Sequence, residues 1–160
     1  MKPKLIILGT NEYQNPLILR AKEMGYETHV YGWQVGEIGE FTADVYHPVN
    51  IMNFDLLWNE CKDIDACGVA LISSEPGMHA EHFLKRKFGI PCNSEWTEEA
   101  TTNKYLMRCA LRDAGIESPN FTLIEGGYAI EEVKNRISNY DFPLIAKPID
   151  STSSKGVMKI

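Results

Sequence analysis

The sequence lacks any apolar run that approaches the roughly 18 to 20 residues of a transmembrane helix, so we expect no membrane span. It also lacks an excess of basic residues: 16 lysines and arginines stand against 22 aspartates and glutamates, giving a formal net charge of −6. Because basic patches bind the phosphate backbone of nucleic acids, we expect no nucleic-acid partner. The aromatic residues are scattered, which argues against a stacking platform for single strands.

Cysteine is scarce and irregularly spaced. The four cysteines form no C-x-x-C pair, which argues against a disulfide framework and against a zinc site. Free thiols are typical of the reducing cytosol, and the N-terminus enters a short apolar run too early for a signal peptide. We therefore predict a cytoplasmic protein.

Two common nucleotide-binding motifs are also missing. The loop after the first apolar run has a single glycine, Gly9, whereas the G-x-G-x-x-G fingerprint uses several glycines to let a pyrophosphate approach the helix. No G-x-x-x-x-G-K-[ST] pattern occurs either. The sequence therefore predicts neither an NAD or FAD site nor a P-loop.

The first part of the chain alternates short apolar runs with amphipathic segments. With 44% hydrophobic residues, the chain can bury a core. Strands that alternate with helices are typical of a parallel α/β sheet with right-handed crossovers. We expect strands over 4–8, 27–31, around Val45 and over 68–72, with helices capped by Asn15 and Asn53 and a further helix over 78–88. The glycine-containing stretch 33–42 is interpreted as a loop.

The second part of the chain begins after a polar connection over 93–100. A helix capped by Thr102 is expected to run to residue 114, followed by a strand over 121–124 and a helix that contains Ile130 and Ile137. The last residues predict a hairpin: a buried strand over 144–146, a loop of small residues over 150–156, and a second strand from Val157.

The predicted hairpin carries the most informative chemistry. Small side chains leave backbone N–H groups uncovered, so such a loop can wrap an anion closely, and Lys147 adds a positive charge at its edge. A triphosphate fits these features. The competing interpretation is that Lys147 and Lys155 only protect an edge hairpin from aggregation.

The hairpin sequence K-P-x-D-S-x-S-S-K-G-V, starting at Lys147, resembles the phosphate-binding hairpin of the ATP-grasp ligases, in particular the branch of carbamoyl-phosphate synthase and biotin carboxylase. A second match lies upstream, where Asn103 and Lys104 open a helix that is followed by Ala114-Gly-Ile and Ser118-Pro. Two motifs in the family's order are more specific than either alone.

The resemblance implies a Rossmann-like pre-ATP-grasp domain over 1–95 and the incomplete start of an α+β ATP-grasp domain over 96–160. The parent protein would be an ATP-dependent ligase that activates a carboxylate or bicarbonate as an acyl phosphate for attack by an amine or ammonia. ATP and Mg²⁺ would be its cofactors, with Mg²⁺ bound mainly by residues outside this chain. The chain itself, as a fragment, is expected to be inactive and to hold no catalytic residue.

The resemblance also assigns the ligand-binding residues. Those matched to ATP phosphates are Lys104, Lys147, Ser151, Thr152, Ser153, Ser154, Lys155 and Gly156, of which Lys155 could equally face solvent. Asn11, Glu12 and Glu75 follow predicted strands, where open α/β sheets bind ligands, and are candidates for the acceptor substrate. His79 and His82 share a helix face, but a solvated face explains them better than a metal site.

A stand-alone α/β binding or regulatory module is the alternative function. Such a module would keep the sheet and dimerise through its first domain. An unrelated nucleotide-sugar or flavodoxin-like domain would explain the first part only and would leave both lysine motifs to chance. The identity of the acceptor does not follow from the sequence.

Overall fold

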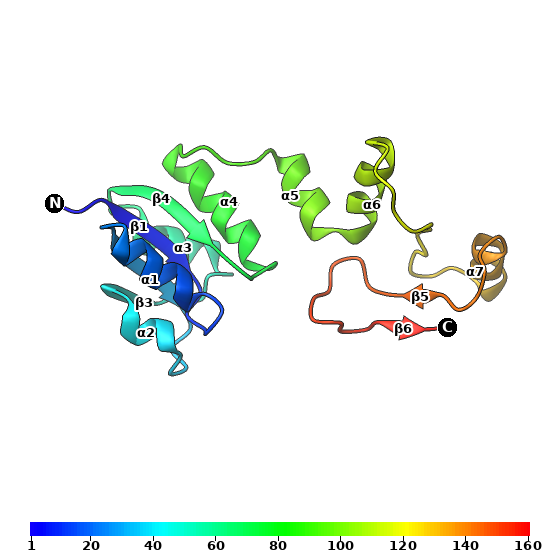
Figure 1. Ribbon diagram of the computed structural model, residues 1–160, viewed down its shortest axis with the longest axis horizontal. Coiled ribbons are helices and arrows are strands. Elements are labelled where there is room, and N and C mark those ends of the chain that lie inside the picture. Colours follow the sequence, from blue (N-terminus) through cyan, green and yellow to red (C-terminus); the bar gives the residue numbers. More distant parts are fainter. The chain divides into compact units, whose positions relative to one another are not determined.

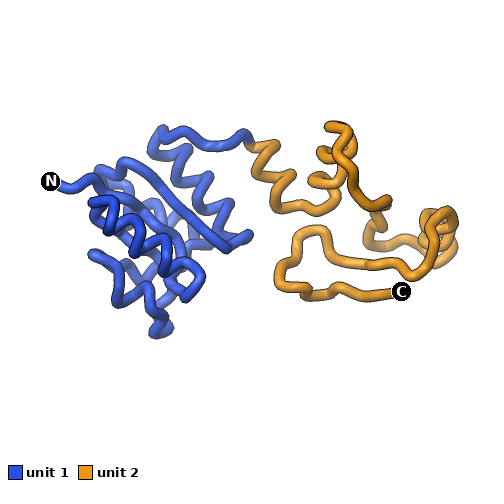
Figure 2. Tube along the Cα trace, viewed as in Figure 1, with its two compact units in different colours: residues 1–94 blue, residues 95–160 orange.

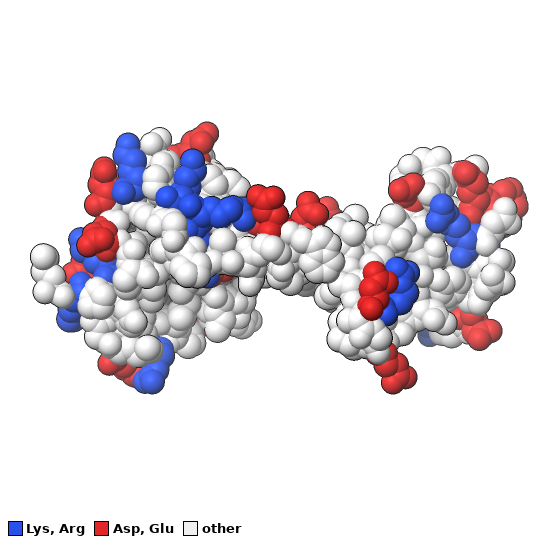
Figure 3. All heavy atoms as spheres, turned by 90° about the horizontal axis from the view of Figure 1, so that it is seen from above, with Lys and Arg blue, Asp and Glu red and all other residues white.

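The computed structural model describes residues 1–160 and separates them into two units, Met1–Ser94 and Glu95–Ile160 (Figure 2). None of the helices in either unit is long and apolar enough to cross a membrane. In the view of Figure 3, acidic and basic side chains lie among one another over both units. The assignment of the two units to ligase domains with a boundary at residue 95 stays a prediction.

A four-stranded parallel sheet forms the centre of the first unit (Figure 1). Its strand order is β3-β2-β1-β4. All three neighbouring pairs are parallel, as expected for strands that alternate with helices. The predicted α/β fold is therefore confirmed. The strands are β1 (Lys4–Leu8), β2 (Glu27–Gly32), β3 (Val45–Pro48) and β4 (Ala66–Leu71).

Both faces of this sheet are covered, because successive residues of a strand point to opposite faces. Ile7 and Val30 pack with Ile18 and Ala21 of α1 (Asn15–Glu23) on one face. The other face is covered by a larger apolar cluster. Residues of β1, β2 and β4 form it together with two helices, α3 (Phe54–Cys61) and α4 (Gly77–Phe88). The buried members of this cluster are Ile6, Leu8, Tyr31, Val49, Leu57, Cys61, Val69, Ala80 and Leu84.

The second unit contains three helices and a two-stranded hairpin. They are α5 (Glu95–Thr102), α6 (Lys104–Asp113), α7 (Ile130–Ile137), β5 (Ile145–Ala146) and β6 (Met158–Lys159). Glu98 and Ala100 are its only buried residues. The prediction of a buried strand at 144–146 is wrong, because Ile145 is 62% exposed and the hairpin packs under no other layer. The unit therefore has no apolar core comparable to that of the first unit.

The interpretation of 33–42 as a loop is wrong in its second half. Residues Ile38–Thr42 form α2, which begins with a capping box between Glu37 and Glu40. The Glu40 carboxylate accepts hydrogen bonds from the backbone N–H groups of Val35, Gly36 and Glu37 at 2.7–2.9 Å. These bonds lower the pKa of Glu40 although burial acts in the opposite direction. The sequence favours a loop here because Gly36 and Gly39 are typical of loops.

Four other local predictions are corrected by the structure. The helix α5 covers most of the expected connection 93–100, and Asn103 rather than Thr102 caps α6 by accepting from two backbone N–H groups. The Thr102 hydroxyl instead donates to the Glu98 carbonyl within α5. Asn15 accepts from Thr42 instead of capping α1. Residues 121–124 form no strand, because no other strand pairs with them.

Gly39 offers a direct test of how α2 is fixed to the sheet. A Cβ atom at this position would lie 2.5 Å from the Thr10 carbonyl oxygen and 2.7 Å from its Cα, so the backbone would have to move. We expect Gly39→Val to lower the free energy of unfolding by about 1–3 kcal/mol in urea titrations. Gly126→Ala, where a Cβ meets nothing within 4 Å, is the control and should change it by less than about 0.5 kcal/mol. Equal stabilities of the two variants would contradict the packing of α2.

Candidate functional site

The predicted terminal hairpin is present. Strands β5 and β6 pair antiparallel, with Ile145 opposite Lys159 and Ala146 opposite Met158. The backbones of Leu144 and Ile160 extend the pairing by exchanging two hydrogen bonds of 2.7 and 2.9 Å. The connecting segment 147–157 is therefore held at both of its ends, and it forms the long loop between β5 and β6 in Figure 1.

The backbone of this loop exposes hydrogen-bond donors. Ser153, Ser154 and Gly156 all have left-handed φ angles, of 54°, 59° and 72°. Their N–H groups donate to no group of the chain, whereas Lys155 and Val157 donate within the loop. Consecutive N–H groups in such a conformation form a concave site that favours an anion. The expectation that small residues leave these donors uncovered therefore has a structural basis.

Lys104 connects the two lysine motifs. Its ammonium group donates to the carbonyl oxygen of Ser151 at 2.6 Å, although the two residues are 47 positions apart. Its backbone N–H also donates to the carbonyl oxygen of Ile149 at 2.8 Å. The helix α6 begins at Lys104, as predicted, so the N-terminal end of this helix lies against the loop. One site in the second unit thus contains both motifs.

Lys147 and Lys155 add positive charge to the same loop. Lys147 directly follows β5, and both side chains are exposed and form no ion pair or hydrogen bond. Exposure agrees with a phosphate ligand and also with the protection of an edge hairpin, so the role of each lysine stays a prediction. The remaining predicted residues, Ser151 and Thr152, are half-buried at the start of the loop.

The candidate acceptor residues lie at the carboxyl ends of two neighbouring strands of the first unit. Asn11 and Glu12 follow β1, Glu75 follows β4, and these strands are paired with Leu8 opposite Leu71. The buried side chain of Gln14 links the two exit loops by donating to the carbonyl oxygen of Ile72 at 2.8 Å. The structure thus brings these loops together as the sheet topology predicts. Whether they hold an acceptor stays a prediction.

The individual side chains differ in availability. The Asn11 side chain accepts from the N–H of Tyr13 at 2.9 Å and so stabilises its own turn. Glu12 is exposed, and Glu75 is half-buried. Sequence reasoning missed Thr10, which is 3% exposed and donates its hydroxyl to Glu37. No spacing pattern signals this contact, because its partners are 27 positions apart.

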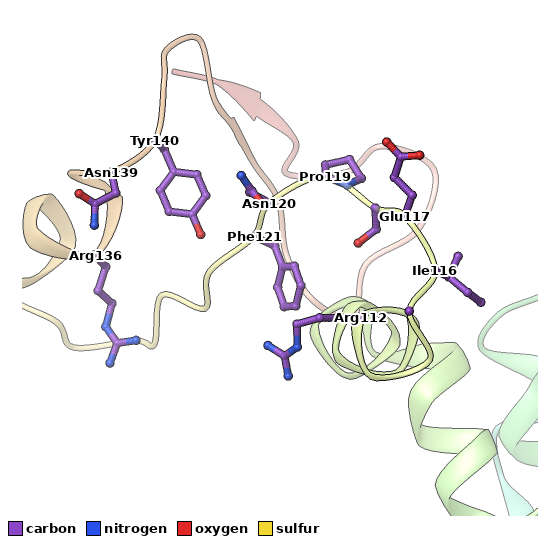
Figure 4. Close-up of a pocket in the computed structure, with 11 residues that line it drawn as sticks. Arg112, Ile116, Glu117, Pro119, Asn120, Phe121, Arg136, Asn139 and Tyr140 are labelled. Carbon is purple, nitrogen blue, oxygen red and sulfur yellow. The ribbon is translucent and has the colours of Figure 1, made fainter.

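A separate shallow pocket of about 720 Å³ lies in the second unit, and Figure 4 shows the side chains that surround it. None of the predicted ligand-binding residues lines this pocket. Arg112 and Arg136, which do line it, stand in the last turns of α6 and α7, where cations stabilise helix ends. They bond to Asp113 and to the Tyr128 hydroxyl, respectively. We assign the pocket no role.

Metal-binding groups are not clustered. No group of three or more His, Cys, Asp and Glu side chains lies where it could hold a metal ion. The cysteines carry free thiols. Burial raises the pKa of the Cys61 thiol to about 11, so this thiol is protonated at neutral pH and is no nucleophile.

Comparisons with known proteins give relatives along nearly the whole chain. The formate-dependent phosphoribosylglycinamide formyltransferase of Prochlorococcus marinus (strain MIT 9515) is 27% identical over 158 residues, which cover 98% of this chain and 40% of the relative. No protein-family model matches the chain.

Solved structures share the fold. N5-carboxyaminoimidazole ribonucleotide synthetase from Thermotoga maritima superimposes with a TM-score of 0.76 at 20% identity, covering 100% of this chain and 41% of that protein. A second similar structure is the biotin carboxylase domain of 2-oxoglutarate carboxylase from Hydrogenobacter thermophilus, solved with MgADP, ADP and bicarbonate. It superimposes with a TM-score of 0.80 at 16% identity, covering 99% of this chain and 37% of that protein. The chain spans about 40% of the length of the curated relatives it matches.

Proposed function

The chain is related to the ATP-grasp ligases, and from this premise we propose that it supplies phosphate-binding and acceptor-binding residues to an ATP-dependent ligase. The ligase would activate a carboxylate or bicarbonate as an acyl phosphate, which an amine or ammonia then attacks. The observation that carries the proposal is the hydrogen bond from Lys104 to Ser151, because it unites the two motifs in one site.

The residues of the loop fit a nucleotide triphosphate. Three uncovered N–H groups, of Ser153, Ser154 and Gly156, belong to the same loop as Lys147 and Lys155. A Cβ on Gly156 would lie 2.8 Å from Cγ of Pro148, so this close turn of the backbone depends on glycine. ATP supplies the phosphoryl group of the reaction. The chain's share is to bind and orient the phosphates, which is the main contribution of a protein to phosphoryl transfer.

The acidic side chains of this chain form no cluster that fits a metal ion, and we assign none of them to Mg²⁺. In the family that the motifs resemble, the Mg²⁺ ligands and the adenine-binding strand lie further along the chain. The proposal therefore attributes only phosphate contacts to residues 104 and 147–156.

The exit loops of β1 and β4 support the acceptor part of the proposal. In this proposal Glu12 and Glu75 would hold a cationic or hydroxyl-rich group, since carboxylates accept hydrogen bonds and attract positive charge. Two of the relatives are named for reactions on phosphoribosyl compounds, with formate as a further substrate in one. We propose a small-molecule amine and a small carboxylate or bicarbonate as the substrates of the parent protein, acting in the reducing cytoplasm.

The test of this function is an isotope-transfer assay on the protein produced from the complete reading frame. The carboxylate acceptor carries a heavy oxygen isotope, and the products are ADP, amide and phosphate. An acyl phosphate transfers one labelled oxygen to the phosphate, so mass spectrometry should find labelled phosphate in the same amount as the amide. Unlabelled phosphate, or ATP hydrolysis that no carboxylate or bicarbonate stimulates, would exclude the ligase and favour the binding module.

Lys104 itself gives a prediction that needs no acceptor. Lys104→Met removes the bond to Ser151, and a bond to a charged group contributes about 1.5–3 kcal/mol. We expect the amides of residue 104 and of Lys155, which donate to the carbonyl groups of Ile149 and Thr152, to exchange about 10-fold faster or more. Lys134→Met is the matched control, because the Lys134 ammonium bonds only to exposed Glu131 on α7. Unchanged exchange in the Lys104 variant would show that this lysine does not hold the loop.

A further inference from the structure

Three titratable side chains of the first unit form a continuous hydrogen-bonded chain that the proposed function does not use. Nε2 of His29 lies 2.9 Å from Oε1 of Glu27, and Nδ1 of His29 lies 3.1 Å from Nε2 of His47. Glu27 and His29 belong to β2, whereas His47 belongs to β3. His29 is buried, and the chain of contacts joins two neighbouring strands.

The number of protons on the two rings determines which hydrogen bonds this chain of side chains can form. With both rings neutral, His29 donates to Glu27 and accepts from His47. With one added proton, His29 donates to both of its neighbours, and Glu27 stabilises the cation. A second added proton places an N–H on each of the two facing nitrogens, so the bond between the rings is lost and two positive charges face each other. The hydrogen bond between the rings is therefore compatible with one added proton and is lost with two.

The surroundings of the pair act on its protonation in both directions. The Tyr31 ring stacks on His47, with centroids 4.3 Å apart and planes within 3° of parallel, and its buried hydroxyl has no hydrogen-bond partner. From α3, Glu60 and the neutral Cys61 thiol face the same region. Burial and the neighbouring His29 lower the pKa of His47, while Glu60 acts in the opposite direction. Besides the histidines, β2 contributes Glu27 and Tyr31 to this region.

Strand β3 lies at one edge of the sheet, where a side-chain link to β2 adds to the backbone pairing. It pairs only with β2, over the register His29–Val45 to Gly32–Pro48, and it ends at a proline, which has no N–H to donate. We propose that the Glu27–His29–His47 chain is a pH-sensitive latch, which holds β3 on the sheet at neutral pH and releases it when both histidines are protonated.

The direction of the effect follows from linkage. His47 has a folded-state pKa below its ordinary value of 6.5, so the unfolded chain takes up this proton first. The stabilisation is complete above about pH 6.5 and is lost as pH falls through the lower, folded-state pKa. In this window the equilibrium constant of unfolding should rise by up to about 10-fold per pH unit from this one proton.

The experiment compares wild type with His47→Gln, whose amide can bond to His29 but does not titrate. Urea unfolding of the 160-residue chain from about pH 7.5 to about pH 5 should be steeper in pH for wild type than for this variant, by up to about one proton. Tyr46→Phe, on the same strand, is the control and should keep the wild-type slope, because it removes a hydroxyl that donates to the carbonyl oxygen of Gly32 but no group that titrates in this range. Identical slopes for wild type and His47→Gln overturn the proposal.

A second readout covers the case in which His47→Gln does not fold. Histidine-ring NMR of wild type should show that one of the two coupled rings titrates below about pH 6.5, while amide exchange in 45–48, corrected for its intrinsic rate, accelerates over the same range. Exchange in β1 should stay unchanged across this range. Both rings titrating at ordinary values, or β1 and β3 accelerating together, would show that there is no latch.

Discussion

Lys147→Met is expected to lower the affinity of the chain for inorganic triphosphate by about 10- to 100-fold. Lys147 follows β5 directly and carries no ion pair, so its charge is available to a ligand in the loop. A hydrogen bond between charged partners contributes about 1.5–3 kcal/mol, which corresponds to this range of affinity. The dissociation constants are measured by calorimetry or by amide NMR shifts at fixed ionic strength, because exposed charges are screened by salt.

Lys159→Met is the matched control for this substitution. Lys159 lies on β6 of the same hairpin, opposite Ile145, and it is exposed like Lys147. If Lys147 and Lys155 only protected an edge from aggregation, both variants would bind triphosphate equally and both would be less soluble. A loss confined to Lys147→Met separates phosphate binding from a general effect of charge on this hairpin.

Leu57→Ala should lower the free energy of unfolding of the first unit by about 2–5 kcal/mol. Leu57 is fully buried and belongs to the apolar cluster between the sheet, α3 and α4. Its neighbour Leu56, on the same helix, is 43% exposed, and Leu56→Ala should cost less than about 1 kcal/mol. Urea titrations followed by circular dichroism give both values. Equal losses would contradict the conclusion that α3 packs on the sheet through its Leu57 side.

Amide hydrogen exchange in the same variant reports on the second unit. Its helices α6 and α7 have strongly amphipathic sequences, yet they contain no buried residue. With so little apolar area removed from water, their amides should exchange much faster than those of β1 and β2, and Leu57→Ala should leave this exchange unchanged.

Strands β1 and β4 could be predicted from the sequence because each contains a continuous apolar run, whereas β2 and β3 mix apolar and polar residues. Within β1, Ile6, Ile7 and Leu8 are fully buried on the two faces of the sheet, and such runs are typical of parallel strands. The helix at Ile38–Thr42 was missed because its start depends on Glu40, whose carboxylate binds backbone groups that precede it. A pattern of apolar periodicity contains no information on that contact.

The candidate site was only partly accessible from the sequence. Both lysine motifs can be recognised in the sequence. The contact of Lys104 with Ser151 cannot, because it spans 47 positions, and only the structure shows it. The pairing of His29 with His47 is a further contact without a signal in spacing, since it depends on the register of β2 with β3. Adjacent strands place such residues together, and sequence reasoning gives no register.

The most direct test of the central claim is an amide NMR titration of the chain with inorganic triphosphate and, separately, with ATP. The claim that Lys104 and the loop form one phosphate site predicts that the amides of Lys104 and of residues 151–156 shift together and saturate along one curve. Because only phosphate contacts are attributed to this chain, both ligands should bind with similar affinity and AMP more weakly. No shift up to about 10 mM ligand, or shifts confined to the Arg112–Arg136 pocket, would contradict the claim.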